Sequence, residues 1–152
     1  MIRVIWAGAS RDRLLADLAE RYAHRISRRT PFRLEDLGVG RGSRPGQVAA
    51  AEGKKFLSRV GPDGYLVTLE DSGQAMGSRP FARWLQELMS RAGGDLFFAL
   101  GGHEGLSDPV RERSNSCISL SSMTFTHEMA RVILLEQIYR ALTILRGEPY
   151  HH

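Results

Sequence analysis

The amino-acid sequence predicts an α/β fold: a single domain in which a mainly parallel sheet is flanked by helices. Segments typical of strands alternate with segments whose apolar residues recur at helical spacing, and this alternation favours parallel strands joined by helices. Residues 65–69 and 96–100 are almost entirely apolar, as expected of strands that helices cover on both faces. A length of 152 residues, with 42% apolar and 25% charged residues, fits one domain over residues 1–152.

The N-terminal part is expected to begin with strand, helix and strand. Residues 2–7 and 32–37 have the alternation and composition of strands, and apolar residues recur at helical spacing over residues 14–26. Ser10 is the expected N-cap of this first helix. Residues 38–46 contain four glycines and no apolar cluster, which predicts a mobile loop.

Four helices and a last strand are expected in the rest of the chain. A second helix ends before the turn at residues 61–64, and a short one begins at residues 107–109. Residues 117–120 form the last strand, and a long helix over residues 128–146 follows, with Thr126 as its N-cap. The helix between the two apolar strands is defined by Phe81, Trp84, Leu85, Leu88 and Met89.

The long helix carries apolar residues on more than one face. A helix that is apolar nearly all round needs two buried sides, and in one small domain the second side is expected to be covered by another subunit. The sequence therefore predicts a homodimer. The residues concerned are Val132, Ile133, Leu134, Leu135, Ile138, Leu142, Ile144 and Leu145.

The composition argues against several classes of protein. Cys117 is the only cysteine, so no disulfide can form within the chain, and no Cys/His cluster has zinc spacing. No secretory signal and no apolar stretch of about 18 residues is found, so we expect a cytoplasmic protein without metal or membrane. Residues 1–60 hold 13 Lys/Arg against 6 Asp/Glu, which favours a polyanionic partner. Arg41 and Arg44 in the glycine-rich loop are candidate phosphate contacts.

Two segments in the C-terminal half are candidates for ligand binding. Residues 101–105, Gly-Gly-His-Glu-Gly, follow a predicted strand, where ligands of α/β domains commonly bind, but they match neither G-x-G-x-x-G nor a P-loop. Residues 120–127 interleave hydroxyl side chains with Met123 and Phe125, which suits a small-molecule pocket. Both segments could instead be structural: a tight strand-to-helix turn and a buried connection before the long helix. Glu104 is either a pocket carboxylate or a capping residue.

Three segments together resemble the ribosomal large-subunit pseudouridine methyltransferase H family, a small branch of the SPOUT methyltransferases. They are Leu-Gly-Gly-His-Glu-Gly-Leu at residues 100–106, Leu-Ser-Ser-Met-Thr-Phe-Thr-His at 120–127, and the long helix with the ending Arg-Gly-Glu-Pro-Tyr-His at 146–151. The order and spacing agree over essentially the whole chain. The resemblance implies a SPOUT-type fold with a C-terminal trefoil knot, which the strand and helix pattern alone would not suggest.

The resemblance also implies an activity and a site. Members of the family transfer a methyl group from S-adenosylmethionine to N3 of a pseudouridine in 23S rRNA on the assembled ribosome, and they are homodimers whose C-terminal tail lies near the partner's cofactor. The implied catalytic residues are Arg140, Tyr150 and His151. The implied cofactor-binding residues are Leu69, Gly102, Ser121, Ser122, Met123, Thr124, Phe125 and Thr126.

Other interpretations stay open at this point. A non-catalytic protein that binds RNA or the ribosome would share the fold and the basic half of the chain. A nucleotide-dependent enzyme using residues 38–46 as a phosphate loop is weakly supported, because the loop lacks the Lys-Ser/Thr pair. His127 is either a proton acceptor or a pocket-wall residue, and Arg140 could be an ordinary solvated charge.

Overall fold

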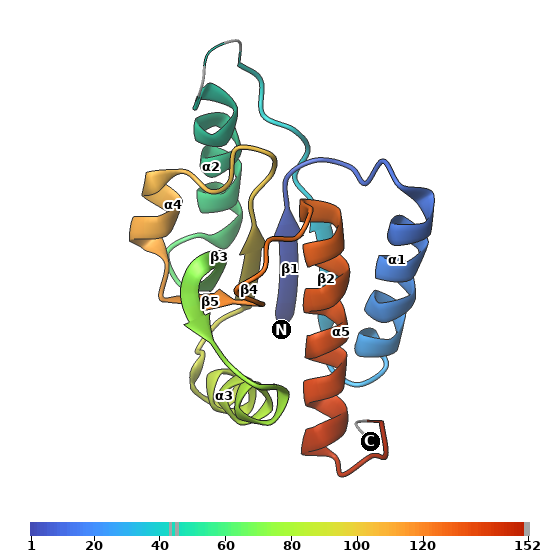
Figure 1. Cartoon of the computed structure of the whole chain (residues 1–152). Coiled ribbons are helices and arrows are strands. Elements are labelled where there is room, and N and C mark those ends of the chain that lie inside the picture. The colour runs from blue at the N-terminus through green and yellow to red at the C-terminus, as the bar shows by residue number, and fades with distance from the viewer. Residues whose placement is uncertain (43, 45, 151–152) are drawn as a thin grey trace.

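Five parallel strands form one sheet in the order β2-β1-β4-β3-β5 (Figure 1). The computed structural model describes residues 1–42, 44 and 46–150. The elements, in chain order, are β1 (Ile2–Trp6), α1 (Arg13–Ser27), β2 (Phe32–Asp36), α2 (Gln47–Val60), β3 (Tyr65–Ala75), α3 (Ser78–Arg91), β4 (Leu96–Leu100), α4 (Asp108–Arg113), β5 (Ser116–Ser119) and α5 (His127–Leu145). The α/β class with a parallel sheet flanked by helices is thereby confirmed. The knot stays a prediction.

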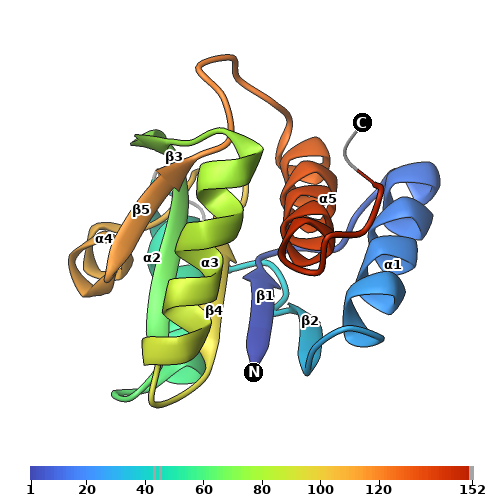
Figure 2. The same cartoon turned by 90° about the horizontal axis from the view of Figure 1, so that it is seen from below.

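Helices cover both faces of the sheet, as the two apolar central strands indicated. Ile2 and Val4 of β1 pack in the same cluster as residues of α1, α3 and α5, whereas Ile5 packs with residues of α2 and α4. The view along the sheet in Figure 2 shows α1 and α5 side by side over β1 and β2. The alternation along β1 therefore directs its side chains into two separate cores.

The long helix α5 has its apolar sides covered within the chain. It packs against both α1 and α3 as well as the sheet, and Leu134, Leu135 and Ile138 are fully buried there. The expectation that a second subunit must cover this helix was therefore wrong, because α1 and α3 of the same chain cover it. The homodimer itself stays a prediction that needs another argument.

Of the two N-caps predicted from the sequence, Thr126 is confirmed and Ser10 is not. Thr126 Oγ1 accepts a hydrogen bond from Met129 N at 3.3 Å and caps α5, as expected. The N-cap of α1 is Asp12, not Ser10, because the helix begins at Arg13 and the Asp12 carboxylate accepts from the amides of Leu14 and Leu15. The Ser10 hydroxyl instead accepts a hydrogen bond from Arg131 on α5.

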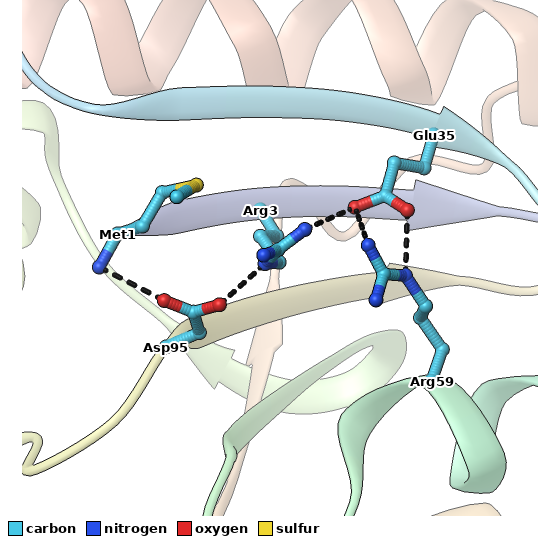
Figure 3. Close-up of polar contacts among 5 residues, drawn as sticks. All are labelled: Met1, Arg3, Glu35, Arg59 and Asp95. Carbon is cyan, nitrogen blue, oxygen red and sulfur yellow. Dashed lines mark hydrogen bonds and ion pairs between the residues drawn. The ribbon is translucent and has the colours of Figure 1, made fainter.

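Ion pairs join β1, β2, the residue before β4 and the end of α2 (Figure 3). Arg3 on β1 binds Glu35 on β2 at 2.8 Å and Asp95 just before β4 at 2.5 Å, while Arg59 at the end of α2 binds Glu35 through two nitrogens. Asp95 also lies 3.2 Å from the amino group of Met1. Burial disfavours the charge on Glu35, but hydrogen bonds from Arg59 and Arg3 outweigh it and hold the pKa of this carboxyl below its ordinary value.

Candidate functional site

A cavity of about 590 Å³ lies at the carboxyl ends of β4 and β5 and along β3. This edge of a parallel sheet is where ligands of α/β domains bind, and the volume is in the range of small-molecule sites. Three segments form the cavity: the middle of β3, the turn after β4 and the connection between β5 and α5. Its lining includes Leu69, Glu70, Asp71, Leu100, Gly101, Gly102, His103, Gly105, Leu106, Ser119, Leu120 and Ser121, and, from the end of the connection and the start of α5, Met123, Thr124, Phe125, Thr126, His127 and Ala130.

Seven of the eight residues expected to bind the cofactor line this one cavity. Only Ser122 is outside the lining. Met123 is 74% exposed and Phe125 is 38% exposed, so two large apolar side chains stand at the cavity without a covering partner in the described part of the chain. The connection is held by local bonds, since Ser119 Oγ donates to Ser121 O and Ser121 Oγ accepts from Met123 N, both at 2.9 Å. The lining residues are Leu69, Gly102, Ser121, Met123, Thr124, Phe125 and Thr126.

The turn after β4 is both a structural turn and a wall of the cavity. Gly105 has a φ of +75°, and its amide donates to Gly102 O at 3.1 Å. A Cβ on Gly101 would lie 2.4 Å from the carbonyl carbon of Gly105, so only glycine fits there. The two interpretations of this segment are therefore compatible.

Glu104 acts as a cap, the second of the roles considered for it. Its Oε2 accepts a hydrogen bond at 3.0 Å from the amide of Ala49 in the first turn of α2. The N-cap of that helix, Gly46, makes no side-chain capping bond. The turn after β4 thus supplies an acceptor that α2 lacks in its own sequence, and the cavity wall is joined to α2.

A second cavity of about 410 Å³ adjoins the first, with Gly102, His103 and His127 common to both linings. Glu52 of α2 is 3% exposed and lines this second cavity. Its Oε1 accepts from Gly40 N at 3.1 Å, and its Oε2 has no hydrogen-bond partner within residues 1–42, 44 and 46–150. The full lining is Ala7, Gly8, Arg11, Val39, Val48, Glu52, Gly102, His103, His127 and Glu128.

Glu52 was not among the residues predicted from the sequence, although a signal for it was present. Ala49, Gly53, Phe56 and Val60 recur at helical spacing and form the buried face of α2. Glu52 falls on that same face, so a carboxylate had to be buried if the helix was to pack.

A buried arginine supports the wall between the second cavity and α5. Arg131 is 1% exposed, its Nη2 donates to Ala7 O at 2.8 Å, and its guanidinium lies 4.6 Å from the centre of the Trp6 ring. Burial lowers the pKa of Arg131, while the charges of Asp36, Glu128 and Glu52 oppose that shift. Arg131 therefore holds the segment after β1 against the start of α5.

Two of the expected catalytic residues, Arg140 and Tyr150, lie at the other end of α5. Arg140 binds Glu136 through Nε and Nη2 at 2.9 and 2.5 Å, so it is paired and not an ordinary solvated charge. The Tyr150 ring packs edge-on against Tyr139, and its hydroxyl donates to Glu136 Oε1 at 3.3 Å. His151 lies outside the described residues.

This position separates Arg140 and Tyr150 from the cavities. At 1.5 Å per residue, His127 at the start of α5 and Arg140 are roughly 20 Å apart along the helix axis. Within one chain, Arg140 and Tyr150 therefore do not form one site with the cofactor-binding candidates. Burial, followed by the hydrogen bond with Tyr22, raises the pKa of Tyr150 to about 12, so its hydroxyl stays protonated at neutral pH.

Two negative observations complete the description of the site. Over residues 1–42, 44 and 46–150 no group of three or more His, Cys, Asp or Glu side chains could hold a metal ion. Within the same ranges no helix combines the length and the apolar character needed to cross a membrane.

Known proteins match this chain over nearly its whole length. Residues 1–151 match the family described as "Predicted SPOUT methyltransferase". The solved structures of a probable methylase family protein from Haemophilus influenzae and of a probable methyltransferase from Bordetella pertussis superpose with TM-scores of 0.59 and 0.57 at 12% and 15% identity. The matches cover 99% of this chain and 70% of the first protein, and 93% of both chains for the second. The fold and the site thus define a methyltransferase of the SPOUT class.

More similar relatives narrow the assignment. Proteins named ribosomal RNA large subunit methyltransferase H from Trichlorobacter lovleyi and Geobacter sulfurreducens are 40% and 36% identical over 151 residues, and each match covers 99% of both chains. The chain belongs to the ribosomal RNA large subunit methyltransferase H family.

Proposed function

We propose that this enzyme transfers a methyl group from S-adenosylmethionine to N3 of a pseudouridine in 23S rRNA on the assembled ribosome. The observation that carries the proposal is the agreement of the family assignment with the geometry of the larger cavity. The relatives are named as rRNA methyltransferases, and seven of the eight expected cofactor-binding residues line one cavity at the carboxyl edge of the sheet. A protein that only binds RNA would not need this cavity.

The lining of the larger cavity fits the methyl donor. Gly101 and Gly102 lack Cβ atoms, so backbone amides can come close to the polar edge of an adenine. Met123 and Phe125 offer apolar contacts to the ring and to the carbon chain of the donor. When bound, the donor supplies an already activated methyl group on its sulfonium, so the residues of the protein mainly have to align the acceptor and remove its N3 proton.

The site is proposed to be completed by a second copy of the chain. Arg140 and Tyr150 lie about 20 Å from the cavity of their own chain, because α5 separates the two places. In a homodimer, Arg140 of the partner subunit can bind a phosphate of the RNA, and Tyr150 of the partner subunit, which stays protonated, can donate a hydrogen bond to the base. His127 and the partner's His151 are the candidate proton acceptors.

Affinity for the ribosome is proposed to come from the basic N-terminal half. Arg41 and Arg44 lie in the loop that leads into α2, and Arg11 lines the smaller cavity. Cations in these segments suit a partner whose backbone carries one negative charge per nucleotide. The enzyme is accordingly proposed to work in the cytoplasm, where assembled ribosomes are found.

The test is transfer of radiolabelled methyl groups from S-adenosylmethionine to unmodified assembled ribosomes. The full chain is compared with a chain truncated after Pro149, and donor binding and mass in solution are measured for both. The proposal expects transfer by the full dimeric chain and loss of transfer after truncation, with donor binding retained. A folded protein that binds the donor but methylates neither ribosomes nor free rRNA would refute the proposed substrate, and a monomeric mass at micromolar concentration would refute the composite site.

A further inference from the structure

The smaller cavity lies at a topological switch of the sheet. β1 and β4 are neighbours, and the helices that follow them pack on opposite faces: α1 lies on the face of α5, and α4 lies on the face of α2. Ala7 and Gly8 follow β1, and Gly102 and His103 follow β4; all four line the cavity. A crevice at this point of an open parallel sheet is a preferred position for a ligand.

The two cavities border each other, which suits two reactants that must meet. The larger one holds the residues assigned to the methyl donor, and Gly102, His103 and His127 border both. The smaller cavity has an apolar wall formed by Ala7, Val39 and Val48, suitable for the face of a flat ring. Its volume of about 410 Å³ leaves room for a nucleobase.

Glu52 gives this cavity a hydrogen-bond acceptor that needs a donor from a ligand. It is 3% exposed, and Oε2 has no hydrogen-bond partner in the described part of the chain, whereas Oε1 is held by Gly40 N. A buried carboxylate oxygen without a donor is unfavourable, and this cost is removed when a ligand brings an N–H group. Glu128, the other carboxylate of the lining, already accepts from Arg11 N. Glu52 Oε2 is therefore the buried carboxylate oxygen of this lining that has no donor in the described part of the chain.

We propose that the smaller cavity binds the acceptor base and that Glu52 accepts a hydrogen bond from N1–H of a uracil linked through C5, so that the enzyme selects pseudouridine over uridine. This inference rests on the proposed function. A uracil linked through C5 has two ring N–H groups, N1–H and N3–H, whereas uridine has only N3–H because its N1 carries the sugar. When N3 faces the methyl donor, N1–H is the group that distinguishes the two nucleosides, and it needs an acceptor.

The test is the variant Glu52→Gln, which keeps the shape of the side chain. Gly40 N–H retains the amide oxygen as its acceptor, so the NH₂ group takes the place of Oε2 and meets N1–H donor to donor. Single-turnover methyl transfer is measured on ribosomes that carry either pseudouridine or uridine at the target position. Donor affinity is measured by calorimetry, and folding by thermal unfolding. Glu112→Gln, which removes an exposed carboxylate from α4, is the matched control.

The expected result is a loss of discrimination with donor binding retained. Transfer to pseudouridine should fall about tenfold to a hundredfold, the range for losing a hydrogen bond to a charged group, and the rate ratio of pseudouridine to uridine should approach one. The control should behave like the wild type. An unchanged ratio in a folded E52Q variant would overturn the inference. So would donor binding weakened more than tenfold with the ratio intact, because Glu52 would then bind the ammonium group of the donor.

A second variant keeps the inference testable if E52Q does not fold. Val39 is 63% exposed and lines the same cavity as Glu52, so Val39→Trp should fill the space without disturbing the core. It should slow transfer to pseudouridine at least about tenfold with donor affinity unchanged. Normal transfer by this variant would show that the base does not enter this cavity. A wild-type protein that methylates neither ribosome would instead refute the proposed function.

Discussion

Replacing Gly101 with alanine should distort the turn after β4, which forms one wall of the larger cavity. The added Cβ would lie 2.4 Å from the carbonyl carbon of Gly105, 2.6 Å from its oxygen and 2.8 Å from Leu106 N. All three are backbone atoms, so no side chain can rotate away. The turn has to open, and the hydrogen bond from Gly105 N to Gly102 O is expected to break.

The size of the effect follows from these two consequences. Overpacking against a rigid neighbour costs about 1–3 kcal/mol, and the lost hydrogen bond costs about 1 kcal/mol. For a chain of this length, 1 kcal/mol corresponds to about 2–4 °C in Tm. We therefore expect G101A to lower Tm by roughly 5–15 °C and to weaken binding of S-adenosylmethionine at least about tenfold, because the displaced turn borders the binding cavity.

Gly93 provides the matched control. A Cβ on Gly93 would meet nothing within 4 Å, and this glycine does not have a positive φ. G93A should change the free energy of unfolding by less than about 0.5 kcal/mol and leave donor binding unchanged. Differential scanning calorimetry and titration calorimetry measure both quantities. If G101A unfolds and binds the donor like the wild type, the assignment of the turn as a rigid cavity wall is wrong.

Three further predictions concern a helix cap, acid stability and ribosome binding. Thr126→Ala should lower the free energy of unfolding by about 1 kcal/mol in urea, because it removes the N-cap of α5; an unchanged midpoint would contradict this. The hydrogen bond from Arg3 lowers the pKa of Asp95 below its ordinary value of 3.8, and arginine hydrogen bonds hold the pKa of Glu35 below its ordinary value of 4.5. The two ionised carboxylates therefore stabilise the fold above these ordinary values. This stabilisation is lost as the pH falls through the lower pKa values of the folded state. Asp95→Asn should therefore be less stable than wild type at neutral pH, and the difference should shrink in acid; a difference independent of pH would contradict it. Replacing Arg41 and Arg44 with alanine should reduce the salt dependence of ribosome binding by about one unit of slope per lost phosphate contact, with donor binding as the control, and an unchanged slope would refute those contacts.

The parts of the fold that the sequence predicted depend on local or periodic signals. The apolar runs at residues 65–69 and 96–100 became the buried parts of β3 and β4, because a strand covered on both faces has to be apolar on both. Thr126 could be identified as a cap from its neighbours alone. The extension of β3 to Ala75 was not predicted. Its last residues, Gln74 and Ala75, pair with β5 only after an irregularity between Leu69 and Gln74, and the sequence of the segment does not indicate that partner.

For the site, the resemblance identified which residues belong together but not where the two groups lie relative to each other. The segments around Leu69, Gly102 and residues 121–126 meet because parallel strands bring their carboxyl ends to one edge. Arg140 and Tyr150 lie at the far end of α5, and a helical sequence does not show what stands opposite its end. The second cavity was not foreseen, because its lining comes from five separate segments.

By itself, the sequence determined the α/β class, the order of the elements and the family, since each of these depends on periodicity or on motifs read along the chain. Only the tertiary structure decided that α1 and α3 cover both sides of α5, that Glu104 caps α2, and that Glu52 is buried with an unpaired oxygen beside the larger cavity. These facts depend on contacts between residues distant in sequence. Burial and hydrogen bonding are properties of such contacts, so they become visible only when the chain is folded.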